Sequence, residues 1–402
     1  MNGSDHGVRE SQLTHLAHKI ELDPTAAQRE YFARACGVAR FSYNWALAEW
    51  NRQYKEGGKP NVYALVKLQN ATKDANWPWM REVCKSAPQY AIHNLGAAFK
   101  RFFAKLARRP KFKRKGERDS FRAAEKEADV SLKGCRVRLP RIGWIRMREA
   151  LRFTGKILFV TVSRTADRWF ASFLVETEIK PIARENQAAI GVDLGIKNLA
   201  TLSDGTVFEN PKALRSNLGK LKRLQRSMSR KKKRSANRAK AKVKLARLHY
   251  RIKCIRKYAI DQVTSYLTKN FGRIGAESLN VKGMLKNRKL SQAISDVGFG
   301  EFGRQLEYKA ALYGSTVVWA SRWFPSSKTC HVCGSINDSL TLRDREWGCK
   351  ECGTHHDRDA NASNNLKILA EKSSVSACGE VVRLDSVKRT SVKQELSAKK
   401  VG

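Results

Sequence analysis

Near its C-terminal end the sequence runs Cys330-His-Val-Cys333, then Cys349-Lys-Glu-Cys352, then Asp357-Arg-Asp-Ala-Asn361. Two CxxC pairs with 15 residues between them have the spacing of a four-cysteine zinc site. A glycine follows each pair, at 334 and 353, and permits the tight turn in which two thiolates reach one ion. We therefore predict a zinc-binding insert at residues 327–353, with Cys330, Cys333, Cys349 and Cys352 as ligands.

The alternative to a zinc site is four unrelated buried cysteines, but the paired spacing would then have to arise twice. Three histidines lie nearby: His331, His355 and His356. We expect them not to be ligands, because four thiolates already fill a closed structural site.

Length and charge indicate the class of protein. The chain has 402 residues, enough for two or three domains, and 42% of them are hydrophobic. With 79 Lys and Arg against 37 Asp and Glu, the net charge is +42, which favours nucleic acid as the partner. A membrane surface is the competing partner, but we find no apolar run of about 18 residues and no secretory signal, so we expect a cytoplasmic location. Nine cysteines, an odd number, favour reduced thiols.

The N-terminal half combines helical and strand patterns. Apolar residues recur at helical spacing from a capping-box pattern at Thr25 and Gln28 to about residue 108. Between 130 and 178 the apolar period changes to two, which is typical of strands. We predict a disordered leader at 1–13, a small antiparallel barrel at 14–24 and 109–180, an inserted helical domain at 25–108 and a linker at 181–187.

Two segments carry a large excess of positive charge. Residues 100–118 hold ten Lys or Arg and one acid, and residues 212–257 hold twenty and no acid. The second segment predicts a helical hairpin with a basic tip. A solvated surface is the alternative, but unbroken like charge destabilises helices unless an anion is bound. The residues predicted to bind nucleic-acid phosphates are Arg108, Arg109, Lys111, Lys113, Arg114 and Lys115, and Arg230, Lys231, Lys232, Lys233 and Arg234.

Three acids occupy positions where a carboxylate is costly without a cation. Asp193 ends an apolar strand pattern, Glu277 ends a second one 84 residues later, and Asp359 opens a helical pattern after another 82 residues. For Asp193 taken alone, a turn-capping role is equally open. Acids at two strand ends and one helix start can gather around Mg²⁺, which prefers oxygen ligands. We therefore predict that these three acids form a catalytic magnesium site.

These motifs resemble the TnpB-type transposon-encoded proteins, RNA-guided nucleases regarded as ancestral to type V CRISPR effectors, over about residues 14–372. The stretches Gly191-Val-Asp193-Leu-Gly-Ile-Lys, Gly275-Ala-Glu277 and Asp359-Ala-Asn361-Ala resemble the family's three RuvC motifs. Pro325-Ser-Ser-Lys-Thr-Cys330 and the CxxC pairs resemble its zinc insert. Two features depart from the family pattern: a long leader, and Ser363 where a second alanine is common.

The resemblance implies an α/β multidomain fold. Its parts are an RNase H-like RuvC nuclease domain at 188–326 and 354–372 with the zinc insert, an antiparallel β-barrel (wedge) domain and an inserted helical recognition bundle. It also implies a Mg²⁺-dependent endonuclease of a transposable element, which uses a guide RNA from the transposon end to cut double-stranded DNA beside a short flanking motif. We expect a monomer associated with the prokaryotic nucleoid, and a disordered tail at 373–402.

Two other functions stay open at this point. An RNA-guided regulator of transcription would bind DNA without cutting, but it would be expected to lack one of the three acids. An RNA-independent transposase or resolvase would have little use for so long a helical region and so high a charge. The acid order Asp, Glu, Asp also differs from the Asp, Asp, Glu of DDE transposases.

Overall fold

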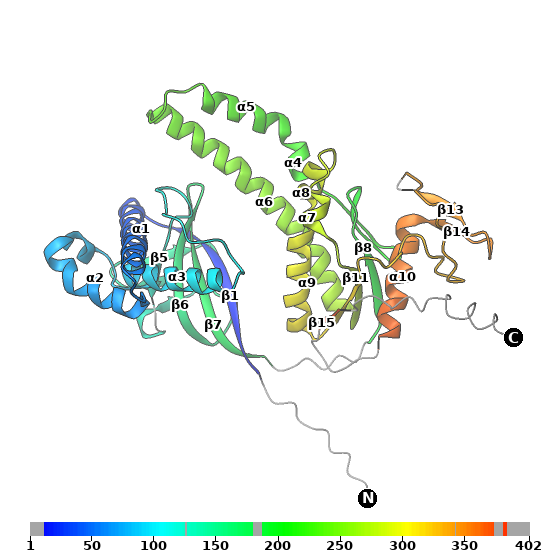
Figure 1. Cartoon of the computed structure of the whole chain (residues 1–402), viewed down its shortest axis with the longest axis horizontal. Helices are drawn as coiled ribbons and strands as arrows, with labels where there is room; N and C mark the ends of the chain where they lie inside the picture. Colours follow the sequence, from blue (N-terminus) through cyan, green and yellow to red (C-terminus); the bar gives the residue numbers. More distant parts are fainter. Residues whose placement is uncertain (1–11, 125–126, 180–186, 342, 374–380, 384–402) are drawn as a thin grey trace, which may run out of the picture. The chain divides into compact units, whose positions relative to one another are not determined.

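The computed structural model describes residues 12–124, 127–179, 187–341, 343–373 and 381–383 (Figure 1). They fall into two compact units: an N-terminal unit of residues 12–179 with 242–247, and a C-terminal unit of the remainder. The predicted leader, linker and tail lie almost entirely outside the described residues. Among the helices of the described part, none combines the length and the apolar character that a membrane span needs.

The N-terminal unit contains one antiparallel sheet. Its strands are β1 (Gln12–Asp23), β2 (Ser120–Ala124), β3 (Ser131–Lys133), β4 (Arg136–Leu139), β5 (Gly143–Met147), β6 (Lys156–Thr165) and β7 (Arg168–Ile179), in the order β2-β6-β7-β1-β5-β4-β3. The N-terminal strand β1 lies inside this sheet, between β7 and β5, as predicted. The outer strands β2 and β3 are not paired with each other in the described residues, so the ladder is open and the expected closed barrel is not confirmed.

Helices complete the N-terminal unit: α1 (Ala26–Lys55), α2 (Val62–Asn76), α3 (Ser86–Phe103) and the short 3-10 helices η1 (Pro78–Glu82) and η2 (Glu127–Asp129). The predicted capping box is present, because Gln28 N donates to Thr25 Oγ1 (3.3 Å) and Thr25 N donates to Gln28 Oε1 (3.0 Å). Phe32 of α1 packs against Phe121 of β2 and Trp169 of β7, with ring centroids 6.0 and 5.0 Å apart. Helices and sheet therefore share one hydrophobic core.

The C-terminal unit contains a mixed sheet of six strands. They are β8 (Ala189–Asp193), β9 (Asn198–Leu202), β10 (Val207–Glu209), β11 (Arg273–Glu277), β12 (Thr316–Ala320) and β15 (Val381–Arg383), in the order β10-β9-β8-β11-β12-β15. The strands β8, β11, β12 and β15 run parallel, and β9 and β10 continue the sheet antiparallel. Strand β15 corrects the prediction of a tail disordered throughout, because residues 381–383 pair with residues 317–319 of β12.

The remaining elements of this unit are α4 (Ala213–Ser216), α5 (Leu218–Ser229), α6 (Ala236–Asn270) except its residues 242–247, α7 (Val281–Met284), α8 (Ser291–Val297), α9 (Phe299–Tyr313), α10 (Arg358–Lys372) and a small ribbon of β13 (Glu346–Gly348) and β14 (His355–Asp357). Helices α5 and α6 confirm the predicted hairpin (Figure 1). At the base of this hairpin, the buried Asp296 carboxylate accepts hydrogen bonds from Leu214 N (2.9 Å), Arg215 N (3.1 Å) and Arg256 Nη2 (2.9 Å). These donors offset the cost of burying the carboxylate, so Asp296 connects α4, α6 and α8.

Helix α10 lies directly on the sheet at two glycines. Gly191 of β8 and Gly275 of β11 are opposite each other in the parallel pair. A Cβ atom at Gly191 would lie 1.8 Å from the carbonyl oxygen of Ser363, and one at Gly275 would lie 2.0 Å from that of Leu366. Because no side chain fits between α10 and these strands, both positions require glycine. The two glycines thus set the distance between α10 and the strands.

Gly191→Ala is expected to lower the free energy of unfolding by about 3 kcal/mol, the upper part of the usual range for overpacking. The added methyl group would meet backbone atoms of Ser363 and Lys367, which cannot rotate away. Gly300→Ala in α9 is the matched control, since no atom lies within 4 Å of its Cβ position. Urea unfolding measures both variants, and an unchanged midpoint for Gly191→Ala would contradict the close packing of α10.

Candidate functional site

Two of the predicted acids end neighbouring strands. Asp193 is the last residue of β8 and Glu277 is the last residue of β11, and these strands run parallel and in register. Because alternate residues of a strand point to the same face, both acids lie on the face that Gly191 and Gly275 present to α10. Asp359 is the second residue of α10. The structure therefore brings the three predicted carboxylates to one end of β8, β11 and α10.

The pKa values of two of these acids are shifted by burial and by the charged groups around them. Burial raises the pKa of Asp193 well above its usual range, and the carboxylates of Glu277 and Asp359 raise it further, while Arg358 lowers it. Burial also raises the pKa of Glu277, and the Ser326 hydroxyl and Arg358 partly offset this effect. Partly buried acids, one of which is disfavoured in its charged form by the others, are typical of a functional site that binds a cation.

The donor set fits a magnesium ion. Carboxylate oxygens are the ligands that Mg²⁺ prefers, and a divalent cation would offset the repulsion among the three acids. Two of the acids also have protein partners. Ser326 Oγ donates to Glu277 Oε1 at 2.5 Å, and Arg345 Nη1 lies 3.6 Å from Asp359 Oδ1.

The four predicted zinc ligands form one cluster. Cys330 Sγ lies 3.6 Å from Cys352 Sγ, Cys333 Sγ lies 3.5 Å from Cys349 Sγ, and all four sulfur atoms lie within 4.8 Å of one another. Four thiols at such distances are the donor set of a structural zinc ion. In the part of the chain that the structure describes, no other group of three or more His, Cys, Asp or Glu side chains brings its ligand atoms this close together.

Both CxxC pairs form the same turn. Gly334 N donates to Cys330 O (2.8 Å) and Gly353 N donates to Cys349 O (3.0 Å), and the φ angles of the two glycines are 79° and 70°. These left-handed conformations agree with the predicted role of the glycines. The Ser335 hydroxyl lies 3.1 Å from Cys349 Sγ. This contact, together with the backbone N–H groups of Cys352 and Glu351, lowers the pKa of the thiol to about 6, which favours the thiolate form that binds metal.

The histidines lie beside the cysteine cluster. His356 Nε2 lies 3.1 Å from Cys330 Sγ, and the His356 ring packs against Trp347 with centroids 4.6 Å apart. His331 instead contacts Asn361 of α10 through its backbone N (3.1 Å) and Nδ1 (2.9 Å). It stays a prediction that the histidines are not zinc ligands. The contact of His331 with α10 was not indicated by the sequence.

The basic segment after α3 is a loop that is attached to α1. Lys113 N donates to Asn44 Oδ1 (2.8 Å), and Lys113 Nζ lies 4.0 Å from the ring centroid of Tyr43. Arg109 Nη2 donates to Asn51 Oδ1 (2.9 Å). The six residues of this loop that were predicted to bind phosphates are all exposed: Arg108, Arg109, Lys111, Lys113, Arg114 and Lys115.

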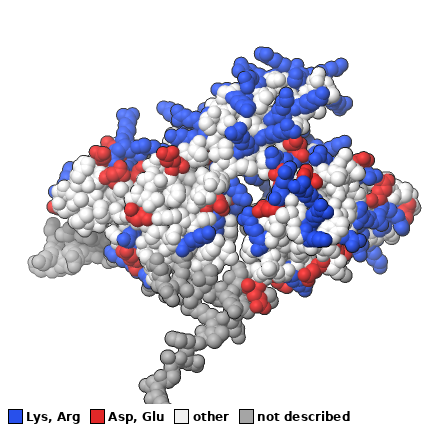
Figure 2. Space-filling view, turned by 180° about the vertical axis from the view of Figure 1, so that it is seen from behind, with Lys and Arg blue, Asp and Glu red and all other residues white. Residues whose placement is uncertain are grey.

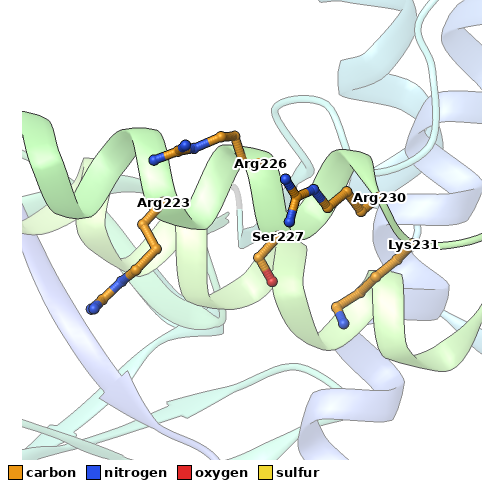
Figure 3. Close-up of a pocket in the computed structure, with 5 residues that line it drawn as sticks. All are labelled: Arg223, Arg226, Ser227, Arg230 and Lys231. Atoms are coloured by element: carbon orange, nitrogen blue, oxygen red, sulfur yellow. The ribbon is translucent and has the colours of Figure 1, made fainter.

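The hairpin carries a concave basic surface, which we call the α5 hollow. A space of about 360 Å³ is lined by Arg223, Arg226, Ser227, Arg230 and Lys231 (Figure 3). Arg223, Arg226 and Ser227 share one face of α5, because they are three and four residues apart, and Arg230 and Lys231 follow directly after the last residue of the helix. The sequence prediction included the last two but missed Arg223 and Arg226, which their helical spacing from Arg230 could have revealed. The other predicted residues of the tip, Lys232, Lys233 and Arg234, are exposed.

Positive charge is not confined to this hollow. Figure 2 shows Lys and Arg side chains gathered over the hairpin of α5 and α6, with few acidic side chains among them. Clustered positive charge of this kind is typical of surfaces that bind nucleic-acid phosphates without reading the base sequence.

Family models match three parts of the chain. Residues 172–288 match a model described as "Probable transposase" (OrfB_IS605), and residues 299–366 match one described as "Cas12f1-like, TNB domain". Residues 14–59 match a helix-turn-helix domain. In this structure residues 14–59 form most of β1, the single long helix α1 and the turn after it, so no two-helix motif is present there.

Relatives cover nearly the whole chain. A protein of Streptomyces pristinaespiralis named "Putative RNA-guided DNA endonuclease" is 39% identical over 395 residues, which are 96% of this chain and 97% of the relative. An Escherichia coli (strain K12) protein named "Putative RNA-guided DNA endonuclease InsQ" is 34% identical over 387 residues, which are 91% of this chain and 94% of the relative. A cryo-EM structure of a Cas12f1-sgRNA-target DNA complex shares the fold, with a TM-score of 0.56, 11% identity and coverage of 89% of this chain and 99% of that chain. The chain belongs to the family of TnpB-type RNA-guided DNA endonucleases.

Proposed function

We propose that this protein is an RNA-guided DNA endonuclease of a transposable element, and that Asp193, Glu277 and Asp359 form its active site. The observation that carries the proposal is the gathering of these acids at the ends of β8, β11 and α10, in a chain whose relatives are named for cutting DNA. The mixed sheet, in which β8 lies between the antiparallel β9 and the parallel β11, supports an RNase H-like RuvC fold for residues 188–326 and 354–372.

In the proposed reaction the three acids hold Mg²⁺. The phosphodiester bond that breaks is the one that the bound DNA places beside this metal site. Bound Mg²⁺ would activate a water molecule and stabilise the charge on the leaving oxygen. Asp193 interacts with the carboxylates of both Glu277 and Asp359, so we give it the central ligand position. Arg358 favours the ionised forms of Asp193 and Glu277, in which they bind a cation. Hydrolysis of this kind leaves a 5′-phosphate and a 3′-hydroxyl.

The proposed partners are a guide RNA from the transposon end and double-stranded target DNA. The guide pairs with one target strand, and the protein reads a short flanking DNA motif. The sheet and helices of the N-terminal unit supply the wedge and recognition modules in this proposal. We propose further that one chain binds one guide as a monomer, and that the complex associates with the nucleoid.

The α5 hollow is the proposed site for nucleic-acid phosphates on the hairpin. Arg223 and Arg226 lie on one side of Ser227, and Arg230 and Lys231 lie on the other (Figure 3). Guanidinium groups match phosphate oxygens in geometry and charge, and the hydroxyl adds a neutral donor.

Replacing Arg223, Arg226, Arg230 and Lys231 with Gln should weaken nucleic-acid binding about equally for all sequences. If each side chain neutralises one phosphate, the slope of log affinity against log salt should fall by about 0.9 for each phosphate that is no longer neutralised. Fluorescence anisotropy at several salt concentrations measures this slope. A second variant with Lys231, Lys232, Lys233 and Arg234 replaced compares the tip with the hollow, and an unchanged slope in both would mean that this part of the hairpin faces solvent.

The proposed function is tested by expressing the gene with its native flanking DNA and sequencing the RNA that co-purifies. The complex should cut a double-stranded DNA that matches this RNA, in the presence of Mg²⁺ and not of EDTA. Cutting that ignores which RNA is supplied would refute guided cutting. Binding of the matched target without any cutting would instead favour a regulator that recognises DNA.

A further inference from the structure

A serine outside the three acids holds one of them in place. Ser326 is buried, with 4% of its surface exposed, and its Oγ donates to Glu277 Oε1 at 2.5 Å. A hydroxyl that donates to a carboxylate forms a short, charge-assisted hydrogen bond. Because one oxygen of Glu277 is fixed in this way, the direction of its other oxygen is also restricted.

Ser326 is in turn held by helix α10. The side chain of Asn365, itself 5% exposed, donates from Nδ2 to the carbonyl oxygens of Ser326 (2.8 Å) and Thr329 (2.7 Å). A buried amide that donates to two carbonyls of one loop fixes the path of that loop. The position of the Ser326 hydroxyl is therefore set by α10 as well as by the local chain.

One turn earlier on the same helix, Asn361 holds the other end of this loop. Asn361 is 1% exposed, its Nδ2 donates to Thr329 O (2.7 Å), and its Oδ1 accepts from His331 N (3.1 Å). Between Thr329 and His331 lies Cys330, the first cysteine of the thiol cluster. The loop of residues 326–331 thus connects the zinc site, helix α10 and Glu277.

We propose that Ser326 is a positioning residue, which aims the Glu277 carboxylate at the catalytic metal, and that the two asparagines of α10 and the zinc insert keep Ser326 in place. The inference rests on the proposed role of Glu277 as a metal ligand. Groups that orient metal ligands contribute strongly to metal binding, and their loss typically costs about 10- to 100-fold in affinity or activity. Ser326 itself does not touch the substrate or the metal in this proposal.

Ser326→Ala removes the hydroxyl and Ser326→Thr keeps it, so the pair separates the hydrogen bond from the packing. Mn²⁺ binding, followed by electron paramagnetic resonance without DNA, gives a readout that is independent of cutting. We expect Ser326→Ala to weaken Mn²⁺ binding by about 10- to 100-fold and to raise the Mg²⁺ concentration for half-maximal cutting by a similar factor. Ser326→Thr should stay within a few-fold of the wild type.

Controls separate this role from a general loss of structure. Ser326→Ala should keep one zinc per chain and should have the melting temperature and the target affinity of the wild type. Ser339→Ala, which changes an exposed serine of the zinc insert, should behave as the wild type does in every assay. Loss of zinc or of the folded state in Ser326→Ala, or failure of Ser326→Thr to restore metal binding, would overturn the inference in favour of a purely structural serine.

Glu277→Ala distinguishes the inference from the proposed function on which it rests. If Glu277→Ala loses Mn²⁺ binding while Ser326→Ala binds as the wild type does, the active site stands and the inference about Ser326 is wrong. If Glu277→Ala itself binds Mn²⁺ and cuts DNA normally, the proposed active site fails. If both variants are impaired, a double variant should be no weaker than Glu277→Ala alone, because the serine acts through the glutamate.

Discussion

Asp193→Ala is expected to lower the rate of Mg²⁺-dependent target cutting by at least about 100-fold, and Glu277→Ala and Asp359→Ala should have effects of similar size. Each substitution removes a carboxylate from a group whose charges are gathered at the ends of β8, β11 and α10. Cutting of a matched DNA by the purified complex is the measurement. Binding of guide RNA and target should survive, because none of the three acids is among the basic residues that are proposed to bind phosphates.

Asp357→Asn provides the matched control for these variants. Asp357 lies two residues before Asp359 but caps α10, and its carboxylate accepts a hydrogen bond from Ala360 N (2.9 Å). Asparagine caps helices about as well as aspartate, so this variant removes a charge next to the site and should keep the helix. Near-normal cutting is expected. Cutting that persisted in Asp193→Ala would contradict the proposed active site.

Cys333→Ser or Cys352→Ser should release about one zinc equivalent per chain and unfold the two turns around the thiol cluster. Binding of structural zinc contributes about 10–16 kcal/mol at neutral pH, so a site that loses a ligand also loses most of the local folding energy. Metal analysis of the purified variants measures the zinc directly. Cutting should also be impaired, because Cys330 and the loop that contacts Glu277 belong to one segment.

The exposed thiol of Cys135, in the N-terminal unit, supplies the control for these serine variants. Cys135→Ser changes the same atom outside the cluster and should keep the full zinc content. If wild-type protein contains no zinc, or if Cys333→Ser retains a full equivalent, the cysteine cluster is not a zinc site.

The sequence predicted the elements whose signals are local. Thr25 and Gln28 marked the start of α1, the CxxC pairs marked the thiol cluster, and apolar periodicity located the hairpin of α5 and α6. The gathering of the acids required more than periodicity. The positions of Asp193 and Glu277 at two strand ends predicted that these acids come together, and the strand order and the direction of alternate residues now give the geometry.

Contacts between distant segments could not be predicted. Ser326 and Glu277 are 49 residues apart, and Asn365 and Ser326 are 39 apart, and neither distance leaves a pattern in the sequence. The spacing of Asn361 and Asn365, one helical turn apart, was the available signal that one face of α10 binds backbone groups. Strand β15 was missed because its pairing depends on the edge of β12 that faces away from β11. Strand patterns alone also did not show that the outer strands β2 and β3 do not pair with each other.

The pairing of β8 with β11 has a consequence for how such proteins can change. Strands β9 and β10 follow β8 in the sheet, and the hairpin of α5 and α6 then comes between β10, which ends at Glu209, and β11, which begins at Arg273, so the hairpin is an insertion between two strands of this sheet. The entropic cost of closing a flexible loop rises by only about 0.6 kcal/mol for each doubling of its length. The hairpin, with its proposed surface for nucleic acid, can therefore be lengthened, shortened or replaced in evolution or by engineering while the register of the strands that carry the acids stays the same.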